Sequence, residues 1–98
     1  MRTIADPVAV RELHLYVDND SDTYFRSYLP VRDNMDRKRA KGKFDQGKAV
    51  KGFEYVTEYA AKRYAKEFGG VWHEMFTAET RRECARELVE SYLAECDE

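Results

Sequence analysis

The stretch from Gln46 to Phe68 constrains the fold of this chain more than any other segment. Asp45 is a favourable helix N-cap in front of it, and Gly69-Gly70 behind it is typical of a helix C-terminus. At about 100° per residue, a set of mostly apolar side chains falls on one face of this stretch. The set consists of Val50, Phe53, Val56, Thr57, Ala60, Tyr64 and Phe68. We therefore predict one long amphipathic helix whose apolar face packs in the core.

The opposite face of the same helix carries lysines and tyrosines at steps of three and four residues, namely Lys48, Lys51, Tyr55, Tyr59, Lys62 and Lys66. Tyrosine rings supply contact area while ammonium groups supply charge, so this combination suits an acidic protein surface or a phosphate backbone. A basic cluster before the helix adds Arg37, Lys38 and Arg39 to the candidate partner-binding residues. In the alternative interpretation, the lysines only solubilise the helix and the two tyrosines pack beneath a neighbouring helix.

Shorter helices are predicted on the N-terminal side of this stretch. Asp6-Pro7 is a helix-start signal, and Val10, Leu13 and Val17 follow at helical spacing. The polar run 18–22 either splits this region into two helices or forms a weak turn inside one long helix. Pro30 marks a kink or a new start, and the basic stretch 31–41 ends at a glycine, Gly42.

A last helix is predicted after an aromatic connection, in which Trp72 and Phe76 should anchor the chain to the core. Thr77 is its N-cap, and its apolar face consists of Ala85, Leu88, Val89, Tyr92, Leu93 and Cys96. No segment alternates apolar and polar residues with a period of two, so no sheet is expected. Residues 1–98 are thus predicted to form a single all-α domain, a compact bundle of about four helices.

Charge is distributed unevenly along the chain. Residues 1–22 carry two basic and five acidic side chains, residues 23–66 carry twelve and five, and residues 67–98 carry three and nine. A basic middle between two acidic ends is typical of surfaces that meet partners rather than of a catalytic cleft. The acidic pI of about 5.7 argues against a dedicated nucleic-acid-binding protein, although binding through the basic segment 32–66 remains the alternative.

Two motifs that resemble functional sites each lack an essential residue. Gly42–Ala49 has the spacing of a phosphate-binding P-loop, but Ala49 stands where a Ser or Thr must bind magnesium. The run Asp18-Asn19-Asp20-Ser21-Asp22 begins like a calcium loop, yet Thr23 replaces the required Gly and Leu29 replaces the bidentate Glu. Neither a nucleotide nor a calcium ion is therefore expected.

The histidines and cysteines are predicted to be structural. His14 and His73 have no partners at metal-ligand spacing. Cys84 and Cys96 lie twelve residues apart on one predicted helix, about 18 Å, which is too far for a disulfide. We expect reduced thiols in a cytoplasmic protein. We predict no catalytic residue, metal ligand or cofactor, and hence a protein that is not an enzyme.

The N-terminal residues contain no apolar signal sequence, and no run of about eighteen apolar residues occurs, so neither a signal peptide nor a membrane span is predicted.

The chain also resembles a group of small helical proteins of tailed bacteriophages and related mobile elements, mostly of unassigned function. The segments that carry the likeness are 12–16 (Glu-Leu-His-Leu-Tyr), 19–20 (Asn-Asp), 44–45 (Phe-Asp) with 48–51 (Lys-Ala-Val-Lys), 61–64 (Ala-Lys-Arg-Tyr), 66–69 (Lys-Glu-Phe-Gly), 75–77 (Met-Phe-Thr) and 81–88 (Arg-Arg-Glu-Cys-Ala-Arg-Glu-Leu). The resemblance implies a cytoplasmic protein acting inside an infected bacterium. It supplies no catalytic residues.

Together these observations favour a small accessory protein that binds a host or phage protein through a basic, tyrosine-bearing helical surface. Inhibition of a host defence system is one form that such binding takes, and a homodimer is compatible with the same surface.

Overall fold

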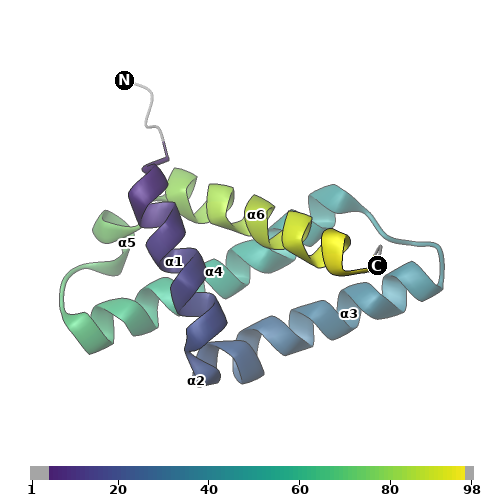
Figure 1. The fold of residues 1–98 in the computed structure, drawn as a ribbon, viewed down its shortest axis with the longest axis horizontal. Coiled ribbons are helices and arrows are strands. Elements are labelled where there is room, and N and C mark those ends of the chain that lie inside the picture. Colours follow the sequence, from purple (N-terminus) through teal and green to yellow (C-terminus); the bar gives the residue numbers. More distant parts are fainter. Residues whose placement is uncertain (1–4, 97–98) are drawn as a thin grey trace.

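The computed structural model describes residues 5–96, apart from the side chain of Cys96. Four long helices make up most of the structure: α1 (Pro7–Asn19), α3 (Leu29–Ala40), α4 (Gln46–Phe68) and α6 (Ala78–Cys96) (Figure 1). The short helix α2 (Ser21–Thr23) and a π-helical turn, Tyr24–Tyr28, connect α1 to α3. A second short helix, α5 (Trp72–Met75), lies between α4 and α6. The described residues include no strand, so the predicted all-α bundle of about four helices is confirmed. None of the helices in residues 5–96 combines the length and the apolar character needed to cross a membrane.

α4 has the bounds that the sequence predicts. The Asp45 carboxylate accepts a hydrogen bond from the backbone N–H of Lys48 at 3.1 Å and so caps the first turn. At the other end, Gly69 and Gly70 have φ angles of 87° and 108°, a region that favours glycine. The chain can therefore reverse directly after Phe68 and enter α5.

Asp20 resolves the ambiguity at residues 18–22 by splitting the region into two helices. Its backbone is extended (φ −87°, ψ 110°), so α1 ends at Asn19, and its carboxylate caps α2 by accepting from the Thr23 N–H at 3.1 Å. From Ser21 the backbone stays helical through Ala40.

The π-helical turn lies directly before Pro30. Proline has no N–H and its ring clashes with the carbonyl four residues earlier, so a regular α-helix is disrupted there. The N–H of Leu29 instead reaches back five residues to the carbonyl of Tyr24. The wider turn lets the helix pass Pro30 without a break.

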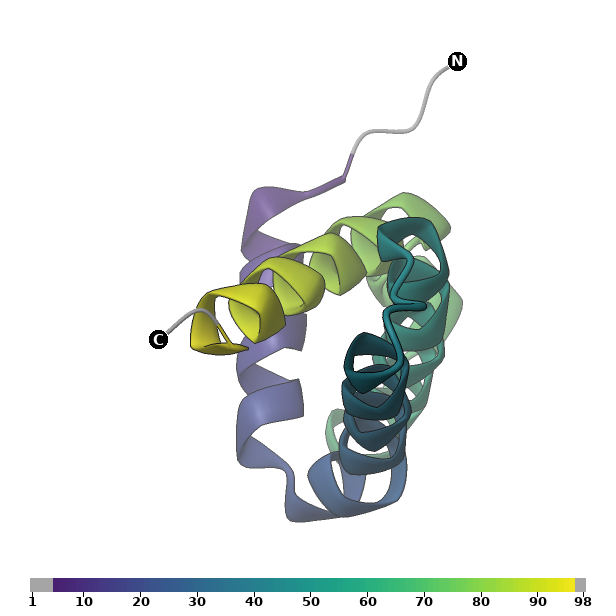
Figure 2. The ribbon, with the colours of Figure 1, turned by 90° about the vertical axis from the view of Figure 1, so that its right-hand side faces the viewer.

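The long helices pack around one core. α4 runs behind α1 and α6 in Figure 1, and Figure 2 shows α1 at the left and α4 at the right. The two helices are in contact, since the ring centroids of Tyr16 and Tyr64 lie 5.3 Å apart. The fully or nearly buried apolar side chains include Val10, Leu13 and Val17 of α1, Phe53, Val56, Ala60 and Ala61 of α4, Phe76, and Cys84, Ala85, Leu88, Val89 and Tyr92 of α6. These residues confirm most of the predicted core faces.

The α4 core face is wrong at one predicted position. Phe68 is 63% exposed, and the last turn of α4, which carries it, extends past α1 in Figure 1. Its ring centroid lies 4.7 Å from that of the neighbouring Tyr64. Three alanines that the periodicity did not place in the core, Ala49, Ala61 and Ala65, are buried instead. Small side chains at these positions let neighbouring helices approach α4 closely.

The aromatic connection behaves partly as predicted. Phe76 is 2% exposed and packs edge-on against Tyr64, with ring centroids 5.0 Å apart, so it anchors the connection. Trp72 is only half-buried. Thr77 caps α6 by accepting from the Thr80 N–H at 3.3 Å.

Replacing Phe53 with alanine tests the core assignment. Its side chain is fully buried and its ring lies 5.5 Å from Tyr28 and 6.5 Å from Tyr92. Phe53→Ala should lower the free energy of unfolding by about 3–5 kcal/mol in urea denaturation, because it leaves a cavity. The matched control, Phe25→Ala, removes a ring that is 64% exposed and should cost less than about 1 kcal/mol. Equal losses for the two variants would contradict this core.

Candidate functional site

The candidate site is the surface of α4 that faces away from the core, called here the α4 outer face. It carries the predicted stripe of Lys48, Lys51, Tyr55, Tyr59, Lys62 and Lys66. The four lysines are exposed, and Tyr55 is 54% exposed. Because α1 packs against the buried side of α4, this face points away from α1, which lies to the left of α4 in Figure 2.

Tyr55 stands at a shallow hollow between α4 and α6. The hollow measures about 350 Å³ and is lined by Lys51, Glu54, Tyr55, Glu58, Ala78, Arg81 and Arg82. An exposed tyrosine beside a concave, charged surface has the properties of an interface anchor, since the ring offers a large area with little conformational entropy to lose.

Carboxylates alternate with cations around this hollow. Glu54 accepts a hydrogen bond from Nε of Arg82 at 3.0 Å. Glu58 forms the intrahelical pair with Lys62 that its spacing permits, at 3.8 Å, and also lies 4.0 Å from Arg81. The hollow is therefore polar and of mixed charge rather than uniformly basic.

Tyr59 forms contacts within the folded chain. Its hydroxyl donates to the carboxylate of Asp22 at 2.6 Å, and its ring is half-buried where α2 meets α4. The hydrogen bond to a carboxylate raises the pKa of Tyr59, because ionising the phenol would remove the donor. For Tyr59, the structure thus resembles the alternative of packing against a neighbouring helix, whereas Tyr55 stays exposed.

The edge of the α4 outer face is held by an ion-pair cluster. Arg63 donates from Nε to Asp20 at 2.7 Å and lies 3.2 Å from the carboxylate of Asp22. The hydrogen bond from Arg63 is the largest cause that lowers the pKa of Asp20 below its ordinary value of 3.8. Asp20 and Asp22, two of the three carboxylates that imitate a calcium loop in the sequence, are therefore paired with an arginine.

The lysines of the stripe differ in their surroundings. Lys62 lies over the ring of Trp72 at 5.0 Å, and Arg81 lies 4.8 Å from the same ring. For Lys48, Lys51 and Lys66, no ion pair occurs among the residues that the structure describes. These three cations keep their charge available to a partner.

The structure separates the three residues of the basic cluster before α4. Arg37, Lys38 and Arg39 lie in the last turn of α3. Lys38 and Lys48 line a common groove of about 260 Å³ between α3 and α4. Arg39 instead lies over the ring of Tyr92 at 5.8 Å, while Arg37 is exposed.

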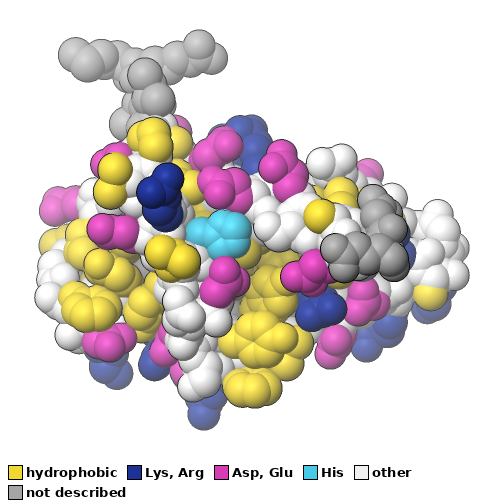
Figure 3. Space-filling model, in the orientation of Figure 1, with side chains coloured by type: hydrophobic (Ala, Val, Ile, Leu, Met, Phe, Trp, Pro, Cys, Tyr) yellow, Lys and Arg dark blue, Asp and Glu magenta, His cyan; other side chains and the backbone are white. Residues whose placement is uncertain are grey.

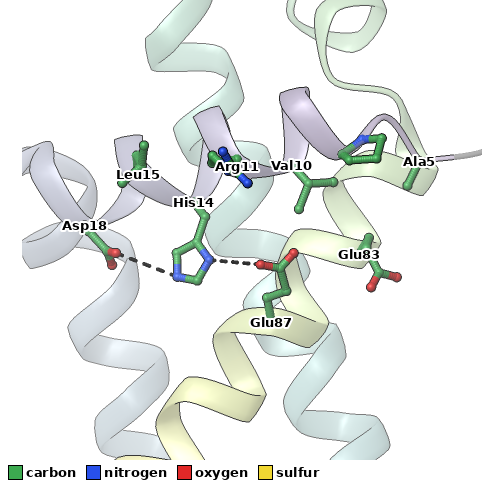
Figure 4. Close-up of a pocket in the computed structure, with 9 residues that line it drawn as sticks. Ala5, Val10, Arg11, His14, Leu15, Asp18, Glu83 and Glu87 are labelled. Carbon is green, nitrogen blue, oxygen red and sulfur yellow. Dashed lines mark hydrogen bonds and ion pairs between the residues drawn. The ribbon is translucent and has the colours of Figure 1, made fainter.

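Sequence reasoning missed a second hollow, where α1 crosses α6 (Figure 4). At its centre, His14 lies 3.7 Å from the Asp18 carboxylate and 3.4 Å from that of Glu87. Glu87 is far from His14 in sequence, so the pair could not be inferred from spacing. One signal was present: Leu15 is apolar but falls off the stripe of Val10, Leu13 and Val17, and it is 54% exposed.

Metal-ligating side chains and the Cys84 thiol are the remaining groups that a functional site could use. Among residues 5–96, no three His, Cys, Asp or Glu side chains are placed to hold a metal ion. Burial raises the pKa of the Cys84 thiol to about 12, so this thiol stays protonated.

Comparisons of the chain with protein-family models, with curated protein sequences and with solved structures found no match. The resemblance to phage proteins therefore stays a prediction from the sequence.

The Asp20–Arg63 pair should make stability depend on pH. Because the folded-state pKa of Asp20 is lowered, its contribution is complete above its ordinary value of 3.8 and is lost as the pH falls through the lowered value. Asp20→Asn keeps an N-cap side chain but removes the charge, and should cost about 1–2 kcal/mol at pH 7. Its cost should become smaller as the pH falls below 3.8, because the carboxylate of the unfolded wild-type chain then binds a proton more readily than the folded one does, and the wild-type protein loses this contribution.

Urea unfolding of both proteins at several pH values measures this difference. The control is Asp33→Asn, which changes an exposed carboxylate that has no ion pair within the described residues. The control should follow the wild-type pH dependence. An Asp20→Asn cost that stays the same from pH 7 to pH 3 would show that the charge of Asp20 does not matter.

Proposed function

We propose that this chain is a small accessory protein, without catalytic activity of its own, that binds another protein through the α4 outer face. Its partner presents an acidic surface with an apolar depression. The observation that carries the proposal is the exposed Tyr55, which stands at a hollow between α4 and α6 with Lys51 beside it. We further propose, from the resemblance to phage proteins, that this binding takes place in the cytoplasm of an infected bacterium, with a host or phage protein as partner.

The arrangement of charge supports a protein partner over a nucleic acid. Nucleic acids present a row of phosphates, so their binding sites are usually uniformly basic. Here Glu54 and Glu58 lie among the cations of the Tyr55 hollow. Several basic side chains of segment 32–66 are also committed to contacts within the fold: Arg32 with Glu95, Arg39 with Tyr92, Lys62 with Glu58 and Trp72, and Arg63 with Asp20 and Asp22.

One observation favours the alternative, nucleic-acid binding. Lys38 and Lys48 line the same groove between α3 and α4, so two cations face one channel. Arg37 adds a further exposed cation on α3. However, Asp45 also lines this groove and lowers its net charge. We therefore keep nucleic-acid binding as the second candidate.

Photo-crosslinking at Tyr55 tests the protein partner directly. Tyr55 is replaced by p-benzoylphenylalanine, and the protein is expressed in bacterial cells and irradiated. We expect a covalent adduct with a different protein, which mass spectrometry identifies. With that partner purified, Tyr55→Ala should weaken binding at least about tenfold, as loss of an interface anchor does.

The same photoreactive residue at Phe25 is the control, because Phe25 is comparably exposed but lies on the π-helical turn. Equal adducts from both positions would indicate non-specific capture. If no different protein is captured from position 55, the proposal is wrong.

Fluorescence polarisation with labelled DNA and RNA tests the second candidate. At about 50 mM salt, where phosphate contacts are strongest, we expect binding weaker than about 10 μM. Tighter binding that is lost both in high salt and in a Lys38→Glu/Lys48→Glu variant would favour nucleic acid instead.

A further inference from the structure

The hollow between α1 and α6, called here the α1/α6 groove, combines an apolar surface with an acidic rim (Figure 4). It measures about 490 Å³, within the range of binding pockets. Pro7 and Leu15 supply the exposed apolar part, with Leu15 54% exposed, and the nearly buried Val10 also belongs to the lining. Exposed apolar surface rimmed by polar groups is typical of a place where another molecule binds.

The rim of the α1/α6 groove consists mainly of carboxylates. Asp18, Glu83 and Glu87 have side chains that are 56%, 44% and 42% exposed. Their partners within the fold are His14 for Asp18 and Glu87, and Arg86 for Glu83, while Arg11 adds one cation to the lining. Figure 3 shows acidic and apolar side chains together on this face of the molecule. The groove therefore suits an apolar or aromatic group that is flanked by cations.

The α4 outer face offers a group of this kind. Tyr55 is 54% exposed, and Lys48 and Lys51 on the same face have no ion pair within residues 5–96. The phenol ring is the right kind of group for the apolar surface, and the two ammonium groups complement the carboxylates of the rim. Both halves of a complementary pair thus occur on one chain.

The two halves cannot meet within one molecule. The α1/α6 groove lies where α1 crosses α6, whereas the α4 outer face is the side of α4 opposite the buried side on which α1 packs (Figures 1 and 2). Tyr55 faces the hollow that α4 forms with Ala78, Arg81 and Arg82, whereas the groove uses Glu83 and Glu87 of the same helix, α6. Contact between the halves therefore requires two molecules.

We propose that the α1/α6 groove binds Tyr55 and the adjacent lysines of a second copy of this chain. The inference rests on the proposed function, because it uses the same α4 outer face and names one acidic, apolar surface that this face fits. The contact is head-to-tail, so each copy keeps one unused groove or face, and short stacks form as concentration rises. Exposed ion pairs are weak, so the stacks are reversible and another partner competes for Tyr55.

Charge reversal combined with sedimentation equilibrium tests this contact. The groove variant is Glu83→Lys/Glu87→Lys, and the face variant is Lys48→Glu/Lys51→Glu. Each should weaken self-association at about 50 mM salt roughly tenfold or more, because attraction becomes repulsion in two pairs. Combining all four substitutions in one chain restores both the original net charge and the complementarity. That chain should self-associate like the wild type.

A matched control variant, Asp33→Lys/Glu74→Lys, changes the net charge as the groove variant does, at exposed carboxylates outside the α1/α6 groove. It should associate like the wild type, and circular dichroism checks that every variant is folded. A wild-type protein that stays monomeric at low salt overturns the inference. So does a groove variant that associates as strongly as the wild type, or a folded four-substitution chain that stays monomeric.

The groove variant also separates this inference from the proposed function. It leaves Tyr55 and its lysines intact, so crosslinking of a different protein at position 55 should persist or increase. Persistent crosslinking together with unchanged self-association would overturn the groove contact alone. Loss of all foreign adducts at position 55 would instead count against the proposed function.

Discussion

Burial of one side of α4 organises the molecule, because each of the other helices in the described chain packs against this helix. α1 and α6 cover its central turns around Phe53, Val56 and Ala60, all of which are fully buried. α3 approaches it closely at Gly52, where an added Cβ would lie 3.1 Å from Val31 and 3.2 Å from Met35. The same packing leaves the α4 outer face uncovered over most of its length. The core and the candidate binding surface are therefore two sides of one helix.

Asp20 and Arg63 determine how the N-terminal half joins this helix. Asp20 ends α1 with its backbone, while its carboxylate caps α2 and accepts a hydrogen bond from Arg63 of α4, so one residue serves two helix ends and a tertiary contact. A buried or half-buried charge of this kind is tolerated because it is paired and hydrogen-bonded. The cluster also draws Tyr59 inward through Asp22. It therefore marks the boundary between the part of α4 that supports the fold and the part that stays exposed to a partner.

Local signals allowed much of the fold to be predicted from the sequence. The bounds of α4 followed from Asp45 and the two glycines because caps act within one turn of the helix. The exposure of Phe68 did not follow, since periodicity assigns a side chain to a face but does not say whether a neighbouring helix reaches that far. The burial of the Tyr59 ring and the pairing of His14 with Glu87 depend on contacts between segments that are distant in the sequence. Such contacts produce no regular residue spacing from which they could be predicted.

The fold places the basic and acidic segments of the chain on different surfaces of the molecule. The basic middle contributes the cations of the α4 outer face, and the acidic ends contribute the carboxylates beside α1 and α6. Within one subunit these surfaces are held apart by the core, so their attraction cannot be used to stabilise the fold. In the contacts that we propose, this complementary charge acts between molecules, where charge speeds encounter and selects partners more than it adds affinity. Affinity would then come from apolar contact, for which the α4 outer face offers the exposed ring of Tyr55.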